Sequence, residues 1–174
     1  MKFLAFLIPL MFLQSNWITF TSKAPAFSIE FPGKIEKKFK IIKTDIGEIE
    51  INTLYHSSSI DSTSNELYLL NYYKLDTAIF KGDSAITKEE YINNIIDNIA
   101  SSLQGTILYS NIDNNNNTTT AIYRIEYNKG QSSMKGKIVL NGEYLYSLEV
   151  FTSKQYSLNK NIERFIKSFY ISPD

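Results

Sequence analysis

The sequence predicts an α+β fold in which a mainly antiparallel β-sheet is flanked by helices. Short runs rich in β-branched and aromatic residues fill most of the chain, and tight turns join many of them. Two further stretches repeat apolar residues at helical spacing, one in the middle of the chain and one near its end. Because hairpins connect most neighbouring strands, we expect an antiparallel sheet.

The first half of the chain is predicted to hold several strands, at residues 17–20, 27–31, 37–43, 48–55 and 66–73. The 66–73 segment is the most informative, because apolar side chains such as Leu69 and Leu70 point to both of its faces. A strand that is apolar on both faces is covered on both sides. We therefore expect this strand to lie centrally in the sheet.

A helix is predicted to follow Thr87, which forms a capping box with Glu90. Gly105 is expected to end it. One face carries an apolar stripe, which we expect to cover the 66–73 strand and which comprises Tyr91, Ile92, Ile95, Ile96, Ile99 and Leu103.

Further strands are predicted at residues 106–112, 119–127, 134–140 and 143–152. Asn141-Gly142 is a strong hairpin signal, and both residues are expected to adopt positive φ. The second amphipathic helix near the C-terminus is expected to bury Leu158, Ile162, Phe165, Ile166 and Phe169.

Residues 1–15 are predicted to be a cleaved signal peptide, and residues 16–174 a single domain. Lys2 supplies a positive charge, residues 3–13 form an apolar run and Ser15 offers a small residue before the cut. The apolar run is too short to span a bilayer, and no membrane span is expected after its removal. An uncleaved interfacial anchor is the alternative. The mature protein is expected in the periplasm or the extracellular space.

Composition restricts the chemistry. The formal net charge is zero, which argues against nucleic-acid binding, and the chain has no Cys and only His56 as histidine. Thiolate chemistry, disulfides and a histidine-based zinc site are therefore excluded. Asp113, Asn115 and Asn117 imitate the start of a calcium loop, but Thr118 and Arg124 occupy its anchor positions. No cofactor and no metal are expected.

Several segments resemble a group of exported bacterial proteins of unassigned function. The resemblance rests on Trp17-x-x-Phe20, on the segment from Ala26 to Lys34 that contains Phe31-Pro32-Gly33-Lys34, and on residues 45–47, 68–72, 144–148 and 165–169. Such sequences are similar to the PsbP-like fold, which the DcrB family and a Ran-binding nuclear-import factor share. The resemblance implies an α/β/α sandwich with an antiparallel sheet, and none of its motifs is catalytic.

The leading functional hypothesis is an exported, non-enzymatic binding or accessory module. Aromatic residues make up 14% of the chain, and Tyr offers contact area at low entropic cost. Tyr72, Tyr73 and Asp76 are the candidate binding surface, for a protein partner or a small apolar ligand. The alternatives are a carboxylate-dependent hydrolase of the cell envelope and, by fold analogy, an envelope chaperone-like subunit.

Overall fold

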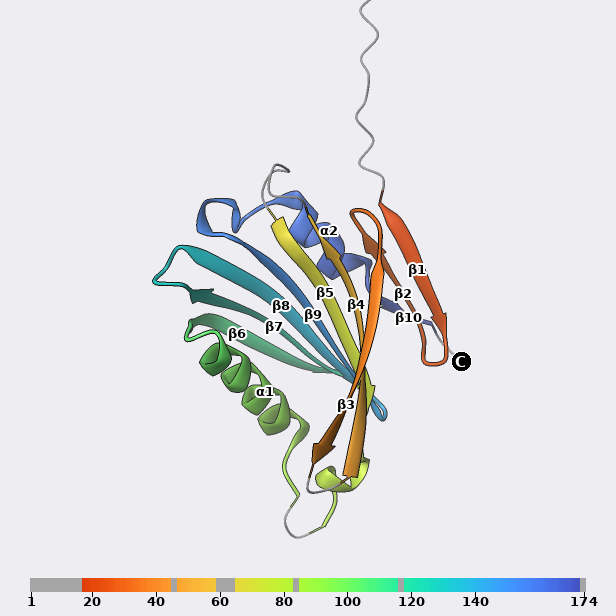
Figure 1. The fold of residues 1–174 in the computed structure, drawn as a ribbon. Coiled ribbons are helices and arrows are strands. Elements are labelled where there is room, and N and C mark those ends of the chain that lie inside the picture. The colour runs from red at the N-terminus through yellow and green to blue at the C-terminus, as the bar shows by residue number, and fades with distance from the viewer. Residues whose placement is uncertain (1–16, 45–46, 59–64, 83–84, 116–117, 173–174) are drawn as a thin grey trace, which may run out of the picture.

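The computed structural model describes residues 17–44, 47–58, 65–82, 85–115 and 118–172. The predicted signal segment, 1–15, lies outside the described residues. Two sheets and two α-helices build the fold (Figure 1). The predicted α+β class, with a mainly antiparallel sheet flanked by helices, is confirmed.

The larger sheet has seven strands in the order β3-β4-β5-β9-β8-β7-β6, and every neighbouring pair is antiparallel. Its strands are β3 (Glu36–Thr44), β4 (Gly47–Ser57), β5 (Asn65–Lys74), β6 (Thr106–Asn115), β7 (Thr118–Tyr127), β8 (Ser132–Asn141) and β9 (Tyr144–Ser153). β5 corresponds to the predicted two-faced strand, and it lies between β4 and β9 as expected for an internal strand.

A smaller sheet has the order β1-β2-β10, with strands β1 (Ile18–Lys23), β2 (Ala26–Phe31) and β10 (Tyr170–Ile171). It lies with helix α2 (Lys160–Ser168) on one face of the larger sheet, whereas helix α1 (Lys88–Ser102) lies on the other face (Figure 1). Two short 3-10 helices, η1 (Thr77–Phe80) and η2 (Lys154–Tyr156), precede α1 and α2. The sequence did not predict that β1 and β2 form a separate sheet.

The core has one half on each side of the large sheet. On the α2 side, Phe27 and Phe31 of β2 pack against Phe165 of α2 and against Tyr68 and Tyr146 of the large sheet. On the α1 side, the buried face of the helix forms one core cluster with residues of β7 and β8, which comprises Ile92, Ile96, Ala100, Ala121, Tyr123, Ile125, Met134 and Ile138. More of the buried aromatic side chains therefore lie between the two sheets than under α1.

Helix α1 begins as predicted. The Thr87 hydroxyl accepts a hydrogen bond from the Glu90 amide at 3.0 Å, and the Glu90 carboxylate accepts one from the Thr87 amide at 2.7 Å. The helix ends just before Gly105, as predicted, and the residue with positive φ at this end is Gln104, at 50°. Gly105 is instead required for close approach: a Cβ there would lie 2.6 Å from Ile125 Cγ2.

Helix α1 covers less of the sheet than predicted. It packs mainly on β7 and β6, at one edge of the sheet, whereas the predicted target was the 66–73 strand (Figure 1). Ile92 and Ile96 are buried, but Ile95 and Ile99 of the same stripe stay half-buried. The stripe is core at Ile92 and Ile96, as expected, but it leaves part of β5 uncovered, and a groove lies beside the helix.

Two other local predictions need correction. Leu158 is 86% exposed and precedes α2, because Asn159 is the N-cap and accepts hydrogen bonds from the amides of Asn161 and Ile162. The β8–β9 hairpin exists, but its loop residues are Gly142 and Glu143, and only Gly142 has positive φ.

Candidate functional site

The groove beside α1 is the candidate functional site. It has a volume of about 330 Å³ and runs between the helix and the faces of β4, β5 and β9. Ile95 and Ile99 form its wall on the helix side. Its other lining residues are Lys40, Ile51, Thr53, Asn71, Tyr73, Leu145, Ser147 and Glu149.

A polar row crosses the floor of the groove. Thr53, Asn71 and Ser147 are direct cross-strand neighbours on β4, β5 and β9. The Thr53 hydroxyl donates a hydrogen bond to Asn71 Oδ1 at 2.7 Å. Since facing side chains of neighbouring strands lie close together, these three residues present hydroxyl and amide groups side by side.

Glu149 is the most unusual residue of the floor. Glu149 is only 7% exposed. The Ser147 hydroxyl donates a hydrogen bond to Glu149 Oε1 at 2.8 Å. Burial raises the pKa of Glu149 to about 7, and the hydrogen bond from Ser147 opposes the rise. Near neutral pH the Glu149 carboxyl therefore exists in both forms: the ionised form only accepts hydrogen bonds, and the protonated form can also donate one.

A buried tyrosine lies behind Glu149. Tyr123 on β7 and Glu149 on β9 flank Gly136 of β8 in one cross-strand row. Burial raises the pKa of Tyr123 well above its usual value, the Glu149 charge adds to the rise, and Ser147 opposes it. Within the described part of the chain, the Tyr123 hydroxyl has no hydrogen-bond partner of good geometry. The floor of the groove therefore adjoins a second buried polar group.

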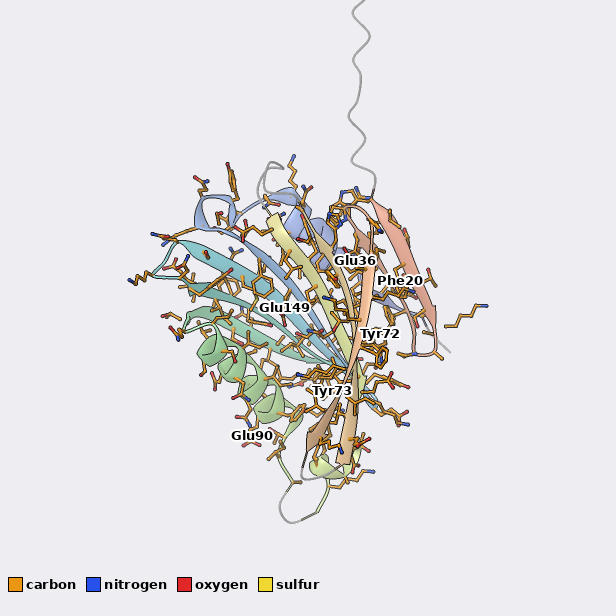
Figure 2. The ribbon with its side chains drawn as sticks, in the orientation of Figure 1. Phe20, Glu36, Tyr72, Tyr73, Glu90 and Glu149 are labelled. Atoms are coloured by element: carbon orange, nitrogen blue, oxygen red, sulfur yellow. The ribbon has the colours of Figure 1, made fainter. Side chains whose placement is uncertain are left out.

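The structure does not bring the three candidate residues of the sequence together. Tyr73 lines the groove, on the α1 side of the sheet, together with Glu149 (Figure 2). Tyr72 lies on the opposite face, with its ring 5.0 Å from that of Phe27 and 6.3 Å from that of Tyr146. Tyr72 is therefore a packing neighbour of the smaller sheet.

Asp76 lies in a second, smaller hollow of about 200 Å³, which Glu48 and Tyr91 also line. Its carboxylate caps η1 by accepting a hydrogen bond from the Ala78 amide at 2.9 Å. Glu48 forms an exposed ion pair with Lys43 at 3.6 Å. The two carboxylates that share this hollow thus both have structural partners.

Tyr73 stands between the two hollows. Burial raises its pKa, and the hydroxyl of Tyr91 beside it adds to the rise. Because Tyr73 lines the groove and Tyr91 lines the hollow of Asp76, this tyrosine pair separates them.

Sequence reasoning missed Glu149, although a signal was present. Ser147 and Glu149 stand two residues apart in the apolar run 144–151, so they share one face of the strand. Two adjacent polar residues on a buried face indicate either a hydrogen-bonded pair or a site. The groove itself could not be predicted, because it depends on where α1 lies across the sheet.

No metal-binding cluster of three His, Cys, Asp or Glu side chains occurs among the residues that the structure describes. No helix of the described residues is long and apolar enough to cross a membrane.

Comparisons with known proteins bear on the fold. No family model matches the chain, and no curated protein is similar to it in sequence. The solution structure of cyanobacterial PsbP (CyanoP) from Synechocystis sp. superposes with a TM-score of 0.58, over 91% of this chain and 94% of that chain. The chain has a PsbP-like fold. The sequence identity between the two chains is 8%, so the comparison shows that they share a fold and says nothing of a shared function.

Proposed function

We propose that the chain is an exported accessory module that binds a small amphipathic molecule in the groove beside α1 without transforming it. The observation that carries this proposal is the buried Glu149 carboxyl in the floor of a groove with apolar walls. Ligand sites typically combine apolar walls with a few convergent polar groups.

The polar floor is costly unless something binds it. The Ser147 hydroxyl and the Glu149 carboxyl are buried and lose hydration, while Thr53 and Asn71 are half-buried. The hydrogen bond from Ser147 satisfies only part of the capacity of Glu149, which has two oxygens. A bound molecule with a hydrogen-bonding head would supply the remaining partners.

The lining indicates the chemistry of the ligand. Ile95, Ile99 and Leu145 would contact an apolar body, while Asn71 and Ser147 would bind a polar head. Lys40 is the cation among the lining residues, so it favours a ligand with an anionic group. The volume of about 330 Å³ suits a small molecule rather than a folded partner.

Filling the groove tests the proposal. Anilinonaphthalene sulfonate, which joins apolar rings to an anion, is the probe, and calorimetry measures its affinity. Ile95→Trp, in the wall, should weaken binding at least about tenfold, which corresponds to about 1.4 kcal/mol. Asn94→Trp, on the exposed side of the same helix, is the matched control and should bind as the unmodified chain does.

Amide shift mapping by NMR locates the probe. Shifts confined to β4, β5, β9, α1 and the part of β3 around Lys40 support the groove. Equal affinity of the Ile95→Trp and Asn94→Trp variants, or shifts centred elsewhere, would overturn the proposal. Turnover of an ester or glycan substrate that is lost in Glu149→Gln would instead favour the carboxylate-dependent hydrolase.

Export is a separate part of the proposal and has its own test. We infer that residues 1–15 direct the chain to the periplasm or the extracellular space and are then removed. Intact-mass measurement of the protein from its native source should give a chain that starts near Trp17. A mature protein that retains Met1 would contradict cleavage.

A further inference from the structure

We propose that the free edge of β3 binds an extended segment of a partner protein, in which acidic and apolar residues alternate, as an eighth strand of the larger sheet. This interaction goes beyond ligand binding in the groove.

Strand β3 offers an uninterrupted template. It lies at one end of the sheet and pairs with β4 alone, in continuous register from Glu36 opposite Tyr55 to Thr44 opposite Gly47. The strand at the other end, β6, has a register shift between Ile107 and Tyr109. Because such irregularities disrupt strand addition, β3 is the better receptor of the two edges.

The charge of β3 favours an acidic partner. The chain as a whole is neutral, yet β3 carries Lys37, Lys38, Lys40 and Lys43 against one acid, Glu36. Of these four lysines, only Lys43 forms an ion pair with a carboxylate among the described residues, whereas Lys37 and Lys38 lie over the rings of Phe20 and Tyr55. Glu36 already accepts a hydrogen bond from the Tyr55 hydroxyl at 2.6 Å. Glu48 and Glu50 of β4 lie opposite Lys43 and Ile41, so the excess of positive charge on β3 is greatest at Lys37, Lys38 and Lys40.

The two faces of β3 set the pattern of the partner. Phe39 and Ile41, which are 72% and 51% exposed, share one face. Lys38 and Lys40 share the other, and Lys37 and Lys43 flank the two apolar residues on the first face. A strand added to this edge would place its side chains on the same two faces, so apolar residues would meet Phe39 and Ile41 while acidic residues meet the two lysines.

A second copy of the chain fits this edge poorly in the register centred on Lys40. Antiparallel pairing of two β3 strands about Lys40 would place Lys40 opposite its own copy, and Lys37 opposite Lys43 of the other chain. Like charges in directly opposed positions are destabilising. Lysines on an edge strand thus discourage self-association while they admit an acidic segment.

Short synthetic peptides test the inference. The probe is an alternating Glu-Val peptide, and its charge-reversed control is the matching Lys-Val peptide; fluorescence polarisation gives the affinity at low salt. The Glu-Val peptide should bind at least about tenfold more tightly than the control. Its affinity should fall as salt is raised, and NMR amide shifts should centre on residues 36–43.

Variants away from the groove separate this inference from the proposed function. Lys37→Glu combined with Lys38→Glu should weaken peptide binding at least about tenfold and leave anilinonaphthalene sulfonate binding unchanged, since neither residue lines the groove. Lys129→Glu combined with Lys154→Glu carries the same charge change away from β3 and should leave peptide affinity within about twofold. Melting curves by circular dichroism check that each variant is folded.

The opposite outcomes are equally clear. Failure of the Glu-Val peptide to bind, equal binding of both peptides, or shifts outside β3 would overturn the inference. If sedimentation shows that the free chain dimerises through β3, the strand that binds this edge is a second copy of the chain and not an acidic partner. Binding to anionic vesicles with no binding of the peptide would point to a membrane surface instead.

Discussion

Tyr123 lies across the backbone of Gly136, its direct neighbour on the adjacent strand: a Cβ at Gly136 would fall 2.2 Å from Tyr123 Cζ and 2.5 Å from the Tyr123 hydroxyl oxygen. The Tyr123 ring occupies the space that a side chain at position 136 would otherwise fill. The Tyr123 hydroxyl therefore lies near Glu149, which is the next residue in the same cross-strand row. One glycine in β8 thus sets the arrangement behind the floor of the groove.

Gly136→Ala should therefore destabilise the protein by about 1–3 kcal/mol, because the added methyl group collides with a buried ring. Urea unfolding measures the change. Tyr123→Leu removes the colliding atoms, so the double variant Gly136→Ala with Tyr123→Leu should be more stable than the sum of the two single changes predicts. Strict additivity in that double-mutant cycle would show that the contact does not constrain the two residues.

The stability of the protein should depend on pH through Glu149. Its pKa is raised from 4.5 to about 7 in the folded chain, so between these values the folded state holds more protons than the unfolded state. The contribution of Glu149 is therefore most favourable below pH 4.5 and declines as the pH rises to about 7, by roughly 3 kcal/mol in total.

Glu149→Gln should remove this decline and raise the melting temperature at pH 8, since the amide stays neutral at every pH. Thermal melts from pH 5 to pH 8 measure the effect. Glu89→Gln, on exposed helix surface, is the control and should preserve the slope of the unmodified chain. An unchanged slope in Glu149→Gln would mean that Glu149 is ionised in the fold throughout this range.

Asn65 should be a strong stability determinant on the α2 side. The residue is 3% exposed; its Nδ2 donates to the Tyr68 hydroxyl at 2.6 Å, and its Oδ1 accepts from Asn159 Nδ2 at 2.8 Å. Asn65→Leu would leave the Tyr68 hydroxyl without this donor and disturb the N-cap of α2. We expect a loss of about 2–3 kcal/mol in denaturant unfolding. Asn98→Leu, at an exposed position of α1, should change stability by less than about 0.5 kcal/mol.

Tyr72 should behave as a packing residue. Tyr72→Ala would remove a ring that contacts Phe27 and Tyr146, and we expect a loss of about 2 kcal/mol in chemical unfolding. Tyr72→Phe keeps the ring and should cost less than about 0.5 kcal/mol. A Tyr72→Ala variant of normal stability that binds a partner less well would restore Tyr72 as a recognition residue.

Local patterns predicted the elements well where short-range chemistry determines them. The capping box of Thr87 and Glu90 and the two-faced strand are examples, because propensity, capping and alternation act over a few residues. Predictions of turn geometry were less accurate. Gln104 adopts the left-handed conformation, whereas the neighbouring Gly105 makes a close contact with β7.

The candidate site was not predictable in the same way. Whether Tyr73 lines a groove depends on how far α1 extends across β5, and this is decided by packing among segments distant in sequence. Gly33, in the Phe31-Pro32-Gly33-Lys34 segment, is a second case in which a contact between distant residues could not be predicted from the sequence. A Cβ at Gly33 would lie 2.6 Å from His56 Cε1, a contact that the sequence spacing does not reveal.

The pairing of β10 with β2 has a consequence for synthesis on the ribosome. Phe27 emerges early, but its partner Phe169, with ring centroids 5.8 Å apart, is translated after nearly all the rest of the described chain. The contacts of β2 with α2 and β10 therefore form only after the large sheet has been made, and closing so long a loop is slow. We expect the final closure of the fold to be a late step, which is compatible with the passage of an unfolded chain through a translocation channel that the proposed export requires.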